Sequence, residues 1–218
     1  PWGIGALRNR AKSLGMTEEE YRSTAQAKLN KIVSNSSVWT RVPANKLRAI
    51  LKDGRFKNQH ETLKAKRHFN PELRKKFEDD FFGSSPDMPN EKRAFYGYLD
   101  TAEPSSNSLL DSYGEVAIRF KSTIRNRTTF TGGDSLNVNK PAMYGEAGWK
   151  PFVQQVPSPI NAPNVESVSH HSDWLTTGDD ANIMKSGFTG FYPEAQMWGG
   201  VSVDDIDEIV FFKRAEME

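Results

Sequence analysis

The chain has 218 residues, of which 36% are hydrophobic, with no cysteine and a net charge of +1. This length suits one domain, or one domain with a helical appendage, and the lack of cysteine excludes disulfides, thiolate catalysis and cysteine-ligated zinc. No run of apolar residues approaches the ~20 that a transmembrane helix needs, so we expect no membrane span. The first residues lack an initiator methionine and the pattern of a signal peptide, so we expect a segment of a longer protein.

Charge is distributed unevenly along the chain. Residues 1–76 contain 18 Lys and Arg against 6 Asp and Glu, whereas residues 77–218 contain 11 against 22. Two interpretations are open: the halves pack together and neutralise one another, or the first half forms a basic face. Such a face would attract nucleic acid, nucleotide phosphates or an acidic partner.

The first third of the sequence predicts helices. Residues 5–34 have a helical pattern, in which Thr17 and Glu20 have the spacing of a capping box and an apolar stripe follows. The stripe consists of Tyr21, Ala25, Leu29, Ile32 and Val33.

Residues 38–42 predict a short strand that Pro43 stops, and residues 44–51 predict a helix that ends near Gly54. A further helix begins at Pro71. The residues expected to face inward are Leu47, Ile50 and Leu51 in the first of these helices, and Leu73, Phe77 and Phe81 in the second.

The rest of the chain is rich in strand patterns and loops. Residues 137–187 are rich in Pro, Gly, Asn and Ser, which predicts mostly loop. A helical first part followed by strands favours an α+β fold over alternating α/β. The expected strands cover residues 94–99, 115–120, 127–131, 194–197 and 206–212.

Glu194 is the first candidate for chemistry, because it stands where a loop enters a short strand. The aromatic residues and glycines around it would let a ligand come close. Gln196, two residues later, would project on the same face of the strand. A solvated glutamate at a strand edge explains the same pattern, so both interpretations are open.

Other candidates lie in earlier strands. Thr129 and Thr131 share a strand face before a glycine pair that would let backbone approach a phosphate, although both patterns are ordinary in strands and turns. Arg41, in an otherwise apolar strand, needs a buried carboxylate or a ligand anion as its partner. Tyr96 and Tyr98 would either stack on a base or nicotinamide, or lie in the core.

An arginine on an early strand, threonines on a middle strand and a glutamate near the C-terminus, in that order, resemble the arginine–serine–glutamate class of ADP-ribosyltransferases. The sequence is most similar to toxin-type members at the C-termini of polymorphic toxins and of some phage head-associated proteins. The segments that carry the resemblance are residues 39–42, 54–59, 95–98, 127–135 and 194–206.

The resemblance implies an α+β fold with an ADP-ribosyltransferase-like split β-sheet core in residues 37–218, preceded by a helical N-terminal extension in residues 1–36. It implies NAD as the substrate and no metal. Arg41 would grip the phosphates or ribose of NAD, and Thr129 and Thr131 would brace the nicotinamide side and orient the glutamate. Glu194 would stabilise positive charge as the glycosidic bond breaks.

The family usually has Gln/Glu-x-Glu with catalysis by the second member, whereas this sequence has Glu194-x-Gln196. In the usual register, Gln196 would take the catalytic place. If Glu194 is catalytic, Tyr192 falls two residues before it, where target recognition usually lies. We favour Glu194, because a glutamine cannot supply negative charge. Gln196 and Tyr96 are then expected at the NAD site.

The implied activity is mono-ADP-ribosyl transfer from NAD to a protein or nucleic acid, or NAD hydrolysis, by a toxin or effector. Such a domain would be secreted or delivered into a target cell as the C-terminal part of a longer protein and act in the cytoplasm, with an immunity protein as a candidate partner. Two alternatives are open: a metal-independent RNase-type toxin that uses His60 or His68 with a carboxylate, and a non-catalytic phage- or toxin-associated binding module.

Overall fold

The computed structural model describes residues 2–63, 70–100, 110, 112–133, 135, 157–166 and 193–212. These residues form a mixed α+β structure with a large antiparallel sheet and several helices. The chain divides into two compact units. The first contains Pro1–Ser36 and Thr129–Glu194, and the second contains Ser37–Thr128 and Ala195–Glu218. The predicted domain boundary at residue 36 stays a prediction.

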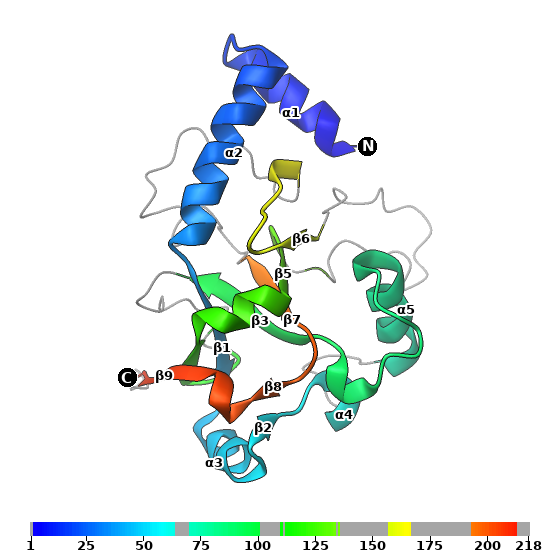
Figure 1. Cartoon of the computed structure of the whole chain (residues 1–218), viewed down its shortest axis with the longest axis vertical. Helices are drawn as coiled ribbons and strands as arrows, with labels where there is room; N and C mark the ends of the chain where they lie inside the picture. The colour runs from blue at the N-terminus through cyan, green and yellow to red at the C-terminus, as the bar shows by residue number, and fades with distance from the viewer. Residues whose placement is uncertain are drawn as a thin grey trace, which may run out of the picture. The chain divides into compact units, whose positions relative to one another are not determined.

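The first unit begins with two helices, α1 (Trp2–Ser13) and α2 (Glu18–Ser34), which pack side by side (Figure 1). The helical pattern of residues 5–34 is thus interrupted, and Gly15 in the connection has a φ of 68°, which favours glycine. The predicted capping box is confirmed: Thr17 Oγ1 accepts from the Glu20 amide at 3.2 Å, and a Glu20 carboxylate oxygen accepts from the Thr17 amide at 2.9 Å. The predicted apolar stripe of α2 is confirmed as buried.

A second segment of this unit packs on α2. Gln26 donates to the Pro163 carbonyl at 2.6 Å and accepts from the Val165 amide at 2.9 Å, and Arg22 forms an ion pair with Glu166 at 3.0 Å. One side-chain amide therefore satisfies both a backbone carbonyl and a backbone N–H of the segment. The unit also contains β6 (Ser158–Pro159) and, from Thr129 onward, its antiparallel partner β5 (Thr128–Thr131).

The second unit is built around β1 (Ser37–Val42), the central strand in the order β7-β3-β1-β4-β9. β1 is antiparallel to both β3 and β4, with Val38 opposite Leu99 and Arg41 opposite Ala117. The predicted strands in these regions are confirmed to within one residue at each end. They are β3 (Phe95–Asp100), β4 (Val116–Phe120), β7 (Glu194–Met197) and β9 (Ile206–Phe211).

One strand begins later than expected. Residues 127–131 were predicted as a strand, but Arg127 ends the 3-10 helix η2 (Ser122–Arg127), so β5 begins at Thr128. The remaining short elements of the second unit are the 3-10 helices η1 (Asn90–Lys92) and η5 (Val203–Asp205) and the paired strands β2 (Arg55–Phe56) and β8 (Val201–Ser202).

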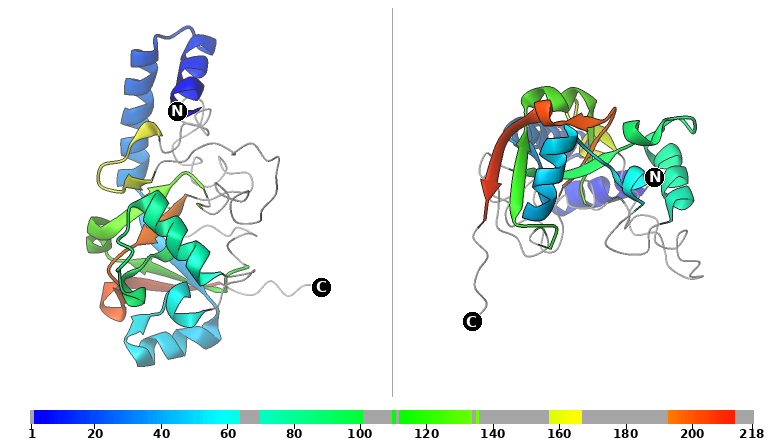
Figure 2. Two further views of the ribbon diagram at one scale, coloured as in Figure 1. Left: turned by 90° about the vertical axis from the view of Figure 1, so that its right-hand side faces the viewer. Right: turned by 90° about the horizontal axis from the view of Figure 1, so that it is seen from below.

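Among the described residues, the sheet of the second unit is accompanied by the helices α3 (Ala44–Asp53), α4 (Gln59–Thr62) and α5 (Pro71–Phe82) (Figures 1 and 2). The predictions that Leu51 and Leu73 face inward are wrong, because these side chains are 51% and 39% exposed. On α5 the buried positions next to Phe77 are instead taken by Arg74 and Glu78. The interior of this unit therefore contains charge. Within the described residues, no helix has the length and apolar character to cross a bilayer.

Candidate functional site

Glu194, the predicted catalytic residue, is buried at the first position of β7 and is 4% exposed. Its Oε1 accepts hydrogen bonds from Ser135 Oγ at 2.5 Å and from the Ser135 amide at 3.3 Å. Ser135 is itself fully buried. Two donors from one residue fix the orientation of the carboxylate, and hydrogen bonds to a charged acceptor are stronger than neutral ones. Glu194 is therefore not the solvated residue of the alternative interpretation.

The two predicted threonines lie in the same unit as Glu194. Thr131 is fully buried and its hydroxyl donates to the Gly133 carbonyl at 2.7 Å. Thr129 is half-buried and pairs with Pro159 of β6. The hydroxyl that orients Glu194 at 2.5 Å comes from Ser135, six residues after Thr129 in sequence, a role that the sequence did not assign to it.

Gln196 is fully buried and belongs to the second unit, two residues after Glu194 on the same strand. All four residues of β7 are buried, so burial does not distinguish its two faces, and the shared face of Glu194 and Gln196 follows from their spacing on the strand alone. Tyr192, the predicted target-recognition residue, lies outside the described residues, as does His68 of the RNase alternative.

Arg41 lies in the middle of the sheet of the second unit and is buried. Its Nε donates to the Tyr98 hydroxyl at 3.3 Å and its Nη1 to the Gly114 carbonyl at 3.4 Å, and the guanidinium lies 3.9 Å from the ring centroid of Phe212. These three partners are neutral, and the ring face stabilises the cation. Because Arg41 and Glu194 belong to different units, their pairing across an NAD-binding cleft stays a prediction.

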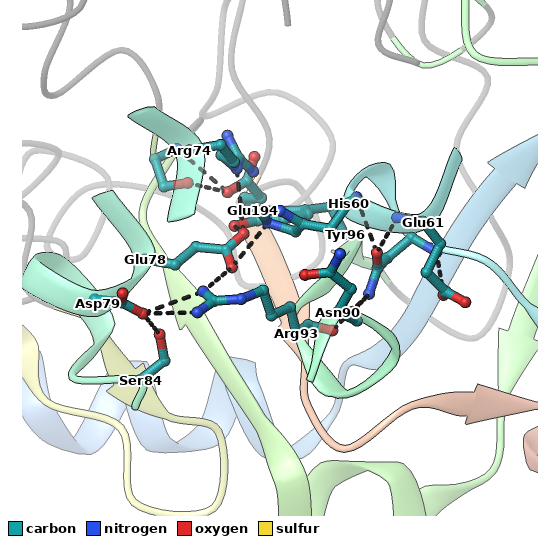
Figure 3. A network of polar contacts seen from close by, with 12 residues as sticks. His60, Glu61, Arg74, Glu78, Asp79, Ser84, Asn90, Arg93, Tyr96 and Glu194 are labelled. Atoms are coloured by element: carbon teal, nitrogen blue, oxygen red, sulfur yellow. Dashed lines mark hydrogen bonds and ion pairs between the residues drawn. The ribbon is translucent and has the colours of Figure 1, made fainter. Parts of the chain in front are cut away.

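Tyr96 is half-buried and belongs to a set of otherwise buried polar residues in the second unit, which we call the Glu78 network (Figure 3). The Tyr96 hydroxyl donates to Glu78 Oε1 at 2.9 Å, and the Arg74 guanidinium lies 4.1 Å from the centroid of the Tyr96 ring. One face of the ring predicted to stack on a ligand is thus covered by a cation. The members of the network are His60, Arg74, Glu78, Arg93 and Tyr96.

Glu78 is the centre of this network and has no exposed surface. Its Oε1 also accepts from Arg74 Nε at 3.3 Å, while its Oε2 lies 3.3 Å from Arg93 Nη1 and 3.2 Å from His60 Nε2. A buried charge is tolerated only when it is paired and hydrogen-bonded, and here one carboxylate joins α4, α5, β3 and Arg93, which lies two residues before β3. The arrangement fastens the two helices to the first residues of an interior strand of the sheet.

Arg93 extends the network to the end of α5. Its Nη1 and Nη2 each donate to Asp79 Oδ1 at 3.1 Å, and Asp79 also accepts from the Ser84 hydroxyl at 2.6 Å. Asn58 holds the backbone of Arg93, because its side-chain amide donates to the carbonyls of Asn90 at 2.6 Å and Arg93 at 3.1 Å. Arg93 is therefore held through both its side chain and its backbone.

The Glu78 network makes the stability of the protein depend on pH. Burial by itself raises the pKa of Glu78, but the close His60 imidazole and the charge of Arg74 outweigh it, so this pKa lies below its ordinary value of 4.5. A carboxyl whose pKa is lowered by folding contributes stability that is complete above its unfolded pKa and is lost as the pH falls through the folded one. We therefore expect the free energy of unfolding to decrease as the pH falls below 4.5.

Urea denaturation at a series of pH values measures this dependence. Glu78→Gln should be less stable throughout and should show a shallower decrease below pH 4.5. Some dependence of stability on pH should remain in this variant, because the pKa of Asp79 is also lowered. Burial alone would raise the pKa of Asp79, but the hydrogen bonds from Ser84 and Arg93 lower it by more. Identical slopes in the two proteins would contradict the assignment to Glu78.

The loop that follows β7 is fixed by Arg127. Its Nη1 donates to the carbonyls of Trp198, at 2.9 Å, and of Gly200, and its Nη2 lies 2.8 Å from both carboxylate oxygens of Asp205. Gly199 and Gly200 have φ values of 83° and 87°, which side chains rarely adopt. These two residues, which are among the glycines around Glu194 expected to let a ligand come close, are thus required by the backbone itself. Arg127 braces the exit of the strand that carries Glu194 and Gln196.

Sequence reasoning missed the residues that hold the site together, although some signals were present. Asn58 and Glu61 have the capping-box spacing, and both reciprocal bonds form. Arg74 and Glu78 are four apart on α5, the spacing of a helical ion pair. No local pattern indicates that Ser135 would reach Glu194 across 59 residues of sequence.

The described residues contain no group of three or more His, Asp or Glu side chains placed to hold a metal ion. Comparison with known proteins adds no assignment: the sequence matches no protein-family model, and no curated protein matches it significantly.

Proposed function

We propose that this chain is an NAD-dependent mono-ADP-ribosyltransferase domain of the toxin type, with Glu194 as the catalytic carboxylate. The observation that carries the proposal is the buried pairing of Glu194 with the hydroxyl and amide of Ser135. A carboxylate held in one orientation and largely shielded from water can stabilise a developing positive charge without reorganising. The order of Arg41, Thr129 and Glu194 along the chain, and the burial of Arg41, support the same proposal.

The reaction requires the bond between nicotinamide nitrogen and ribose C1′ to break. Nicotinamide leaves with the electron pair of that bond, and C1′ takes on oxocarbenium-like charge, which the Glu194 carboxylate offsets. A nucleophile on the acceptor, or water in the case of hydrolysis, then bonds to C1′ and loses a proton. We propose that a macromolecule is the acceptor, and that a longer parent protein delivers the domain into a target cell, where an immunity protein neutralises it.

The RNase alternative is less well supported. His60, the described one of the two histidines it would use, is 4% exposed and its Nε2 lies 3.2 Å from the fully buried Glu78. A general acid or base must have a ring nitrogen available to its substrate, and the Nε2 of this imidazole already faces the carboxylate at the centre of the Glu78 network.

Incubation of the chain with NAD labelled in the nicotinamide ring and, separately, in the adenine tests the proposal. We expect free labelled nicotinamide, and adenine label on a macromolecule when cell lysate is present. If nicotinamide is not released with or without lysate, the proposal is wrong. Cleavage of RNA in the absence of NAD would favour the RNase alternative.

Ser135 should act as a positioning residue for Glu194. In Ser135→Ala the carboxylate loses its hydroxyl donor, and since a hydrogen bond to a charged group is worth about 1.5–3 kcal/mol, we expect the kcat of nicotinamide release to fall by roughly 10–100-fold. The KM for NAD should change little, because Ser135 bonds to Glu194 and not to substrate in this proposal. Ser135→Thr, which restores a hydroxyl, should recover part of kcat. Equal loss in both variants would contradict the role.

A further inference from the structure

The helix α3 carries an exposed basic face. Lys46, Arg48 and Lys52 are exposed, and among the described residues their side chains form no hydrogen bond or ion pair. Leu47 is the only buried residue of this helix, so only a small part of the surface of α3 is packed against its unit. In Figures 1 and 2 it lies at one end of its unit beside β2.

Three described carboxylates on or near α3 already have partners. Asp53, its last residue, accepts from Lys57 at 2.6 Å, and Glu61 pairs with Arg55. Glu115 accepts from the Ala44 amide at 3.2 Å, at the positive N-terminal end of the helix. None of these acids forms a hydrogen bond or ion pair with Lys46, Arg48 or Lys52, although the charge of Lys52 also acts on Asp53, so the outer face keeps most of its positive charge.

Several other exposed or half-buried cations of the second unit are paired with acids. Lys76 pairs with Asp80, and Arg119 pairs with both Asp207 and Glu208. On α3, by contrast, Arg48 and Lys52 are one turn apart on the same side of the helix. Like charges at this spacing destabilise a helix. An arrangement that weakens the helix is explained if an anion binds to it.

From this geometry we infer that the exposed face of α3 binds the phosphate backbone of nucleic acid and thereby docks the acceptor. A phosphate backbone requires only cations and amide donors, which Arg48, Lys52 and Asn45 supply. An acidic protein partner fits less well, because protein interfaces are depleted in lysine and depend on large apolar anchors. Leu51 is the one large apolar residue exposed on this helix, and single exposed apolar residues are common.

The inference rests on the proposed function only for the transfer step, and binding can be measured without NAD. Fluorescence anisotropy of short labelled RNA and of a labelled DNA duplex should report binding by the whole chain that weakens with salt. In the triple variant K46Q/R48Q/K52Q, we expect affinity to fall about tenfold or more, and the slope of log K against log salt to decrease by about 2. The RNA and DNA arms identify which backbone is preferred.

The control variant K76Q/R119Q/K121Q changes net charge equally but alters cations that already bond to Asp80, to Asp207 and Glu208, and to the Asp204 carbonyl. It should bind nearly as the original chain does. Equal loss in both triple variants, or tighter binding of polyglutamate than of either nucleic acid, would overturn the inference. Nicotinamide release should be unchanged in the α3 variant, so a chain that binds nucleic acid but releases no nicotinamide contradicts only the proposed function.

Discussion

Glu194→Gln is expected to lower the rate of nicotinamide release by roughly 10²–10³-fold while leaving the protein folded. The amide has the shape of the carboxylate and can still accept the Ser135 hydroxyl hydrogen bond, but it carries no negative charge. Loss of a preorganised electrostatic group typically has an effect of this order. Release of nicotinamide is the direct measurement, and the thermal midpoint of each variant reports whether the fold is intact.

Gln196 provides the matched test, because it is buried on the same strand two residues later. If Glu194 is catalytic, Gln196→Asn should retain far more activity than Glu194→Gln. If the register instead gives the catalytic place to Gln196, the original chain should be inactive and Gln196→Glu should create activity. That second result would remove Glu194 from the centre of the mechanism and leave the family resemblance intact.

Where one face of an element is apolar and the other polar, the sequence predicted the structure well. The stripe on α2 repeats at helical spacing and is buried as expected, and the short β-prone runs became β1, β3, β4, β7 and β9. These signals are local, since each depends on residues within one turn of helix or a few positions of strand. The fold class follows from them.

Which side of α5 is buried could not be predicted in this way. Leu73 is apolar but exposed, whereas Arg74 and Glu78 are buried, so hydrophobicity predicts the wrong face. The orientation depends on Arg93 and Tyr96, which lie 15 and 18 residues beyond Glu78 in the chain. Tertiary partners of this kind override local preference, and Ser135 bonding to Glu194 is a second case.

The largest effect on stability is expected at Glu78. In Glu78→Gln the side chain keeps its size but loses its charge, so Arg74 loses its ion pair with Glu78, while Arg93 keeps its ion pair with Asp79. Breaking a buried ion pair from one side typically costs about 3–5 kcal/mol, because the remaining charge stays buried. Urea denaturation followed by tryptophan fluorescence is a suitable measurement, since Trp39 and Trp198 both belong to the second unit.

α5 contains its own control for this prediction. Lys76 and Asp80 form a pair with the same four-residue spacing as Arg74 and Glu78, but their side chains are 72% and 65% exposed. Asp80→Asn should therefore change the free energy of unfolding by no more than about 0.5 kcal/mol. If Asp80→Asn and Glu78→Gln destabilise the protein equally, spacing on the helix and not burial governs the effect, and the Glu78 network does not hold α4 and α5 to the sheet. If Glu78→Gln destabilises the protein far more than Asp80→Asn, and Asp80→Asn retains nicotinamide release, then the buried charges of α5 stabilise the fold and its exposed charges do not.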